Sequence, residues 1–104
     1  MIRHVVLLAL SDTAASAELA EVMAGLGDLV GRIKGFETFE HGPNRDLEGK
    51  TPGYPYGFVA GFADIAALER YAADPRHQVL GARLVALCAG GAEGILVMDL
   101  EVGA

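Results

Sequence analysis

The sequence predicts one α+β domain, residues 1–104, in which helices cover one face of a four-stranded antiparallel sheet. The length is that of a single domain, and neither a linker nor an internal repeat divides it. Apolar segments with the composition of strands alternate with segments of helical periodicity in the order β-α-β-β-α-β. Because 52% of the residues are hydrophobic and helices cover only one sheet face, we expect the other face to pack against a second copy.

The first half of the chain is expected to form a strand, a helix and a second strand. Residues 2–10 are apolar at both alternating positions, as in a strand buried on both sides. Residues 13–31 place their apolar side chains on one helical stripe, and either Thr13 or Ser16 caps the start of this helix. Residues 36–41 form the second strand.

A polar stretch rich in glycine and proline, residues 42–53, follows the second strand. Loops of this length in small domains are usually functional or mobile. The third strand is expected at residues 54–62, with aromatic side chains on one face. Gly57 and Gly61 lie on its other face, where another group can approach the backbone closely.

Two helical segments and a strand complete the chain. Residues 64–73 have apolar side chains at helical spacing, and Asp74 and Pro75 then start a new helix. Asp is a preferred N-cap, and Pro is favoured at the first helical position. This helix extends to about residue 89, and residues 95–102 form the last strand. The whole pattern is that of a ferredoxin-like unit.

Composition and charge argue against two classes of partner. The chain has 14 acidic and 8 basic residues, a net charge of −6 and no Lys/Arg cluster, so a nucleic-acid partner is not expected. The apolar run near the N-terminus is too short for a signal peptide or a membrane span, so no membrane partner is expected either. The one cysteine, Cys88, makes no internal disulfide, which fits a cytoplasmic protein.

Four segments of the chain resemble segments of the stress-responsive A/B-barrel family. In chain order they are residues 2–7 (IRHVVL), 53–58 (GYPYGF), 71–78 (YAADPRHQ) and 96–99 (LVMD). The family usually has Gly-Tyr-Thr-His at the start of the second segment and Tyr-x-x-His-Pro-x-His-Gln in the third. The four matches keep their order and span nearly the whole chain.

The resemblance implies a homodimer of ferredoxin-like units whose sheets pack into a dimeric α+β barrel. One branch of the family resembles polyketide cyclases, which close a linear polyketone by aldol chemistry without a cofactor. Another branch resembles stress-induced stable proteins without catalysis. The wider superfold includes cofactor-free monooxygenases and isomerases, so the fold by itself does not decide the function.

His77 is the main candidate for chemistry. It lies in the first turn of the helix that follows Asp74, where the helix dipole disfavours a charged imidazole. The resemblance implies that His77 lies on the barrel lumen, with Asp99 as its carboxylate partner. An imidazole oriented by a carboxylate acts as a general base. The alternative is a structural hydrogen bond that ties the helix to the last strand.

Four further residues are candidates for the same site. His4 lies among apolar residues of the first strand and, by resemblance, faces the lumen, although it also fits a satisfied core histidine. Tyr71 matches the tyrosine of the family segment, although it also fits a core aromatic with a solvated hydroxyl. Tyr56 stands where the family often has histidine, and we expect Tyr56 and Phe58 to contact a substrate.

No cofactor and no metal are expected. The glycines at 25, 27 and 31 lack the spacing of a dinucleotide fingerprint and lie in a helix instead of after a strand. The three histidines lack the short spacing of metal ligands, and Cys88 fits a core position.

The sequence therefore predicts a cofactor-free enzyme or binder for a small apolar or polyketone-like molecule. In this hypothesis His77 removes a proton next to a carbonyl, and Tyr71, Tyr56 or His4 hydrogen-bonds the oxygen that gains charge. Two alternatives remain. One is a non-catalytic, stress-related structural protein in which the polar residues fix strand register and dimer geometry. The other is a cofactor-free monooxygenase or isomerase of the same superfold.

Overall fold

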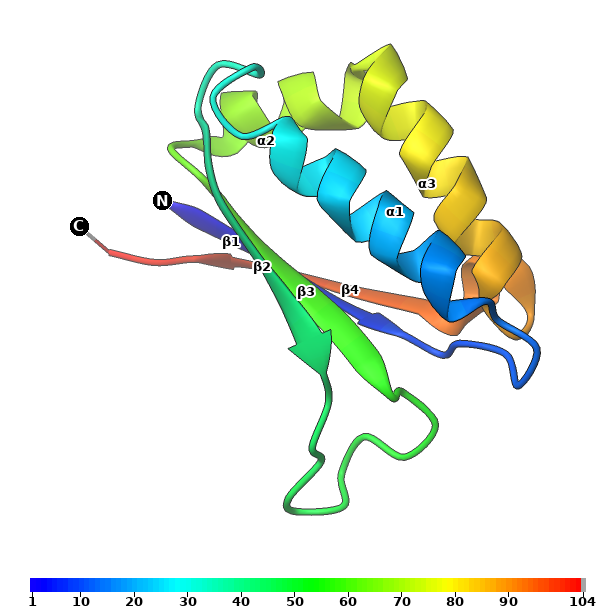
Figure 1. Ribbon diagram of the computed structural model, residues 1–104. Coiled ribbons are helices and arrows are strands. Elements are labelled where there is room, and N and C mark those ends of the chain that lie inside the picture. Colours follow the sequence, from blue (N-terminus) through cyan, green and yellow to red (C-terminus); the bar gives the residue numbers. More distant parts are fainter. Residues whose placement is uncertain (104) are drawn as a thin grey trace.

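The computed structural model describes residues 1–103 as a four-stranded antiparallel sheet with the three α-helices on one of its faces (Figure 1). The strands are β1 (Ile2–Leu8), β2 (Phe36–Pro43), β3 (Tyr56–Phe62) and β4 (Ile95–Glu101). The helices are α1 (Ser16–Asp28), α2 (Ile65–Ala73), α3 (Pro75–Leu87) and the short 3-10 helix η1 (Gly91–Gly94). The strand order β2-β3-β1-β4 is that of a ferredoxin-like unit, so the predicted fold class is confirmed.

Several boundaries differ from the predicted ones. β1 ends at Leu8, because Leu10 leaves the sheet and forms an isolated bridge with Cys88. Helix α1 begins after Ala15, which makes no side-chain cap hydrogen bond, so neither predicted cap residue acts as one. β3 begins at Tyr56 instead of residue 54, because Tyr54 uses its carbonyl to bind the loop side chain of Asn44.

The covered face of the sheet carries the hydrophobic core. Alternate residues of β1 point toward the helices, and Ile2, Val6 and Leu8 are at most 4% exposed there. Phe36 of β2 and Phe62 of β3 are also buried on this side, with ring centroids 4.9 Å apart in a stacked arrangement. Burying these side chains supplies the main driving force for folding.

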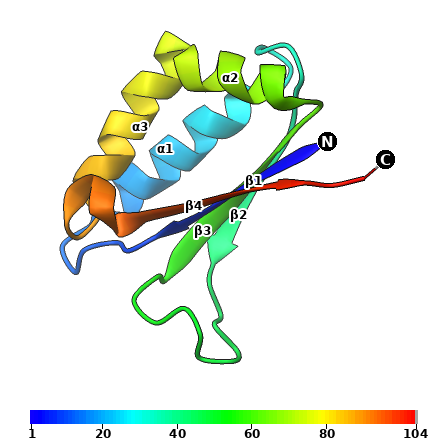
Figure 2. The same ribbon diagram turned by 180° about the vertical axis from the view of Figure 1, so that it is seen from behind.

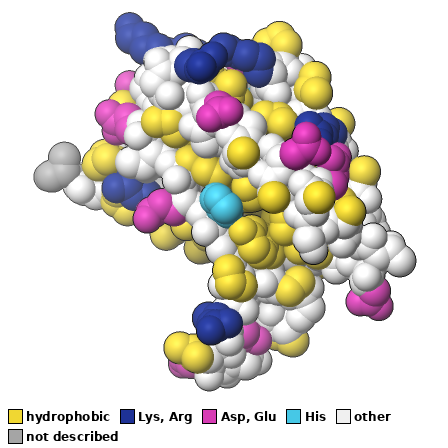
Figure 3. Space-filling view, in the orientation of Figure 1, with side chains coloured by type: hydrophobic (Ala, Val, Ile, Leu, Met, Phe, Trp, Pro, Cys, Tyr) yellow, Lys and Arg dark blue, Asp and Glu magenta, His cyan; other side chains and the backbone are white. Residues whose placement is uncertain are grey.

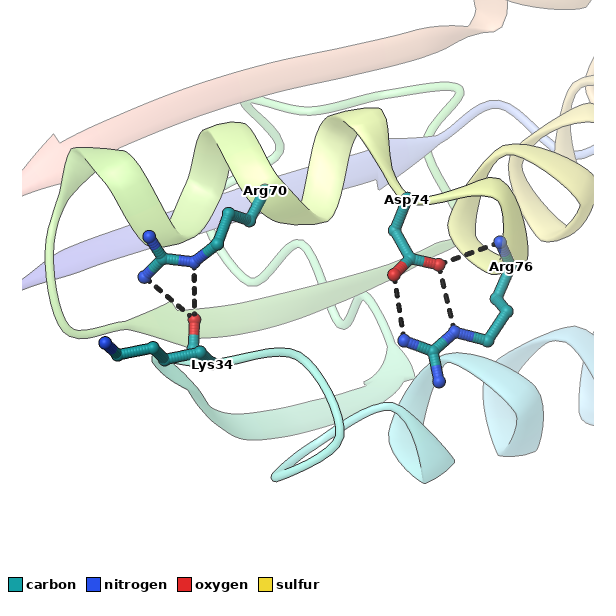
Figure 4. Close-up of polar contacts among 4 residues, drawn as sticks. All are labelled: Lys34, Arg70, Asp74 and Arg76. Carbon is teal, nitrogen blue, oxygen red and sulfur yellow. Dashed lines mark hydrogen bonds and ion pairs between the residues drawn. The ribbon is translucent and has the colours of Figure 1, made fainter.

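Asp74 joins α2 to α3 and confirms the predicted helix start. It is the C-cap residue of α2 and the N-cap residue of α3, and its Oδ1 accepts a hydrogen bond from the Arg76 backbone N–H at 2.9 Å. The Arg76 guanidinium binds the same carboxylate through two more hydrogen bonds (Figure 4). This guanidinium lowers the pKa of Asp74 to about 2. The junction therefore has a fixed geometry that orients both helices.

Charged side chains are not evenly spread in space. The Arg70 guanidinium donates to the Lys34 carbonyl at 3.1 and 3.2 Å, so two basic residues that are distant in sequence become neighbours (Figure 4). Figure 3 shows Lys and Arg side chains gathered at one end of the molecule, and hydrophobic side chains around a histidine near the centre of the view. Among residues 1–103, no helix has the length and apolar character that crossing a membrane requires.

The opposite face of the sheet has no helix on it (Figure 2). Its apolar side chains on β4 are Leu96, Met98 and Leu100, and these are 44–50% exposed. Gly57 lies on this face, and a Cβ there would come within 2.7 Å of the Val6 carbonyl oxygen, which explains the glycine. A surface of this apolar character is typical of a protein interface, and we expect a second copy of the chain to cover it.

Replacing Leu96 and Met98 together with aspartate is expected to convert a dimer into a monomer, because the change places two charges on this apolar face. Light scattering on a sizing column measures the mass. Val79→Asp is the matched control, since Val79 is an apolar residue of α3 that is 63% exposed. A wild-type monomer would contradict the expectation, as would an unchanged dimer of the double variant.

Candidate functional site

Three of the predicted site residues meet on the helix-covered side of the sheet. His4 comes from β1, Tyr71 from α2 and His77 from α3. The Tyr71 ring lies 3.9 Å from the His77 ring and 6.0 Å from the His4 ring, measured between ring centroids. The Tyr71 side chain is 1% exposed, so the three rings meet at a buried position.

Aromatic side chains surround this position. The Tyr71 ring packs edge-on against Phe36 at 5.1 Å and Phe62 at 5.0 Å, and the Phe58 ring lies 6.3 Å from that of His4. Phe58 is 5% exposed, so its ring is buried beside that of His4. The surroundings of the polar groups are thus apolar and aromatic.

Asp99 binds His4. The two residues stand directly opposite each other in the register of β1 and β4, and His4 Nδ1 lies 2.6 Å from Asp99 Oδ1. The His4 side chain is 15% exposed and that of Asp99 is 43% exposed. When Nδ1–H donates to the carboxylate, the proton is fixed on Nδ1 and the lone pair remains on Nε2. His4 is then the imidazole that a carboxylate orients.

The predicted pairing of His77 with Asp99 is therefore wrong. Asp99 lies on β4, next to β1, and its carboxylate is hydrogen-bonded to the histidine in the neighbouring strand. The expected location on a lumen between two sheets is also wrong for these residues. Strand alternation turns His4, like Val6, toward the helices, so the site lies inside one protomer.

Two buried polar atoms of the site have no hydrogen-bond partner among residues 1–103. They are the Tyr71 hydroxyl oxygen and His77 Nδ1. Burial raises the pKa of Tyr71 well above its ordinary value, so its hydroxyl keeps its proton at neutral pH. An unpaired buried polar group costs about 1–3 kcal/mol, and native proteins retain few of them. Both atoms are therefore buried and unpaired within this part of the chain.

His77 is held in its neutral form. Burial is the main cause that lowers the pKa of His77, and the nearby His4 adds to this effect. The Ala72 backbone and the Asp74 carboxylate have the opposite effect and raise this pKa. Within residues 1–103, His77 Nδ1 makes no hydrogen bond of normal geometry. The neutral ring expected from the helix dipole is thus also favoured by desolvation.

Tyr56 does not join the site. Its hydroxyl is hydrogen-bonded to His41 Nδ1 at 2.7 Å, and it pairs in the sheet with Leu8. Ala60 is the β3 residue that pairs with His4, and it lies four positions, or about 13 Å, further along the strand. His41, to which the sequence assigned no role, is thus the partner of Tyr56.

The described residues, 1–103, contain no group of three or more His, Cys, Asp or Glu side chains placed to hold a metal ion. Cys88 is 7% exposed, and its burial raises the pKa of the thiol. The chemistry that the site offers is therefore that of two histidines, a carboxylate and a tyrosine.

Comparison with known families agrees with this architecture. The model of the stress responsive A/B barrel domain matches residues 2–102, which is nearly the whole chain. The chain belongs to the stress-responsive A/B-barrel family. The resemblance predicted from the four segments is thereby confirmed. A search of curated protein sequences finds no match to this A/B-barrel chain.

Solved structures share the fold. A dimeric ferredoxin-like protein of unknown function from Jannaschia sp. is 48% identical to this A/B-barrel protein, with a TM-score of 0.91 over 97% of this chain and 98% of that one. Two more distant structures are enzymes by name. The hydroxynitrile lyase of Passiflora edulis has 14% identity and a TM-score of 0.81, over 98% of this chain and 93% of its own. SnoaB, a cofactor-independent oxygenase of Streptomyces nogalater, has 21% identity and a TM-score of 0.74, over 97% and 91%.

Lowering the pH below about 6.5 is expected to destabilise the protein through His77. The folded-state pKa lies below that of an unfolded histidine, about 6.5, so the folded state binds fewer protons between the two values. The stability that comes from the neutral ring is complete above that pH and is lost as the pH falls toward the folded-state pKa. Urea unfolding at acidic and neutral pH measures this loss.

His77→Gln is expected to remove this component of the pH dependence, because glutamine does not titrate. His41→Gln is the control, since His41 is an exposed histidine whose removal leaves the His77 environment unchanged. Identical pH dependence of the wild type and His77→Gln would refute the assignment.

Proposed function

We propose that this protein is a cofactor-independent enzyme that moves a proton on a small apolar molecule carrying a carbonyl group. The supporting observation is the meeting of the His4–Asp99 pair with two unpartnered buried polar atoms, on Tyr71 and His77, in aromatic surroundings. General bases and hydrogen-bond donors are most effective when they are positioned in such an apolar environment.

His4 is the general base in this proposal. Asp99 accepts the Nδ1–H, so the Nε2 lone pair is free to take a proton from the carbon next to the carbonyl. The electron pair of the broken C–H bond passes into the enolate, and the Asp99 carboxylate stabilises the imidazolium that forms. The sequence predicted His77 as the base. The proposal assigns this role to His4 instead, because Asp99 is hydrogen-bonded to His4.

Tyr71 and His77 bind the oxygen that gains negative charge. The Tyr71 hydroxyl is protonated and buried, and no acceptor in the described part of the chain, residues 1–103, pairs with it, so it donates to that oxygen. The neutral His77 ring lies against Tyr71 and offers a second hydrogen bond from Nδ1 when that atom carries the proton. Donors that are fixed in advance stabilise such a charge without reorganisation.

Apolar substrates fit the surroundings of these groups. Phe58, Phe62 and Phe36 present aromatic surface to the site, and polyketone-like or aryl ketone molecules have the complementary character. Two proteins of the same fold are named as a lyase and as a cofactor-independent oxygenase, so this fold includes enzymes. The polar groups of the present chain favour the proton-transfer class.

Asp99→Asn is expected to reduce turnover by roughly 10²-fold or more, because an amide no longer fixes the His4 tautomer or stabilises its charged form. Exchange of the α-hydrogens of aryl methyl ketones for deuterium, followed by NMR, measures the proton transfer directly. Tyr56→Phe is the matched control, since it removes a hydrogen bond to a different histidine. Full activity of both Asp99→Asn and His4→Gln would refute the proposal.

Tyr71→Phe separates catalysis from a purely structural role. The hydroxyl has no partner within residues 1–103, so its removal is expected to raise the free energy of unfolding by about 1 kcal/mol while the ring packing is kept. The same change is expected to reduce exchange by roughly tenfold or more, because one oxygen-binding donor is lost. A structural protein would show the stability gain only, and unchanged exchange would exclude Tyr71 from the chemistry.

A further inference from the structure

Gly81 occupies a position where neither backbone nor packing calls for glycine. It lies in the middle of α3, where glycine is less favourable than alanine, and its φ is not in the left-handed region. Among residues 1–103, and apart from its chain neighbours and the backbone of α3, a Cβ built there has one atom within 4 Å, His77 Nε2 at 4.0 Å. In contrast, a Cβ at Gly25 of α1 would come within 2.8 Å of Leu80 Cδ2, so close helix packing accounts for that glycine.

Gly81 lies next to the open side of His77. The two residues are four positions apart in α3 and therefore share a helix face. Both are partly exposed, whereas Nδ1 of the His77 ring is buried. The accessible part of the imidazole is thus away from Nδ1, and Nε2 borders the space that a side chain at position 81 would fill.

The neighbouring strand leaves this side of the molecule accessible. β4 is the edge strand next to β1, and six of its seven residues are exposed. Val97, which points to the helix side of the sheet, is 48% exposed, and the Asp99 side chain is 43% exposed. Figures 1 and 2 show α3 and β4 on the same side of the molecule.

We propose that Gly81 is the specificity-determining position of the site, a proposal that rests on the function proposed above. A substrate approaches between α3 and β4, and the part of it that lies away from the reacting carbonyl rests over Gly81. The missing side chain makes room for a bulky group such as an aryl ring, and this use of the space accounts for a glycine that weakens the helix.

Gly81→Ala and Gly81→Leu test the proposal, because both strengthen the helix and are expected to fold. Gly27→Ala in α1 is the matched control: it also replaces a helical glycine with alanine, and its Cβ would make an ordinary contact with Phe39 at 3.5 Å. Diethyl pyrocarbonate, which acylates neutral imidazole, is the probe of His77, with the exposed His41 as the internal reference. Mass spectrometry of peptides gives the rate at each histidine.

The expected result is that His77 reacts at the same rate in the wild type and in Gly27→Ala. It reacts more slowly in Gly81→Ala and most slowly in Gly81→Leu, and the rate at His41 is the same in all four proteins. In the exchange assay, Gly81→Ala is expected to reduce kcat/KM for aryl ketones by roughly tenfold and to leave that for acetone unchanged. Equal His77 rates in all variants, or an unreactive wild-type His77, would overturn the role of Gly81. If the wild type exchanges no ketone, the proposed function fails, and the graded His77 rates still decide whether Gly81 controls access.

Discussion

β1 lies inside the sheet, and its register against both neighbours determines where the polar groups of the molecule go. Pairing with β4 places Asp99 opposite His4, and pairing with β3 places Ala60 on the other side. Because side chains alternate along a strand, a slip of one residue would turn His4 to the face without helices and separate it from Tyr71. The buried apolar residues of β1 hold the correct register, so the hydrophobic core and the His4–Asp99 pair depend on the same alignment.

The connection between α2 and α3 is the second element that the site requires. Asp74 ends one helix and begins the next, and Tyr71 and His77 stand three residues before and after it. The contact of the two rings at 3.9 Å follows from this short junction. Arg76 holds the Asp74 carboxylate through three hydrogen bonds, so the junction is fixed by residues that do not touch the site rings themselves.

The sequence predicts the fold well because its signals are local. The apolar strands, the helical stripes and the Asp74–Pro75 start each depend on neighbours within a few residues, and the structure contains all of them. The predicted cap, Thr13 or Ser16, was wrong, because α1 begins after Ala15, whose side chain has no polar atom to cap a helix. The family resemblance implied that His4, Tyr71 and His77 lie together, and the structure brings these three rings to one place.

The pairing of Asp99 could not be predicted in the same way, because it depends on the register of two strands that are distant in the chain. A sequence shows that an acid and a histidine lie in apolar strands, and only the sheet order makes them neighbours. Tyr56 illustrates the same point. It shares a face with Phe58, but the distance along the strand and the hydrogen bond to His41 remove it from the site.

The location of the site on the helix side has a consequence for an assembled protein. All of its groups come from one chain, and the apolar face that a second copy would cover is the opposite side of the sheet. Each half of a dimer would therefore carry its own copy of these groups, and inactivating one half would leave those of the other half in place.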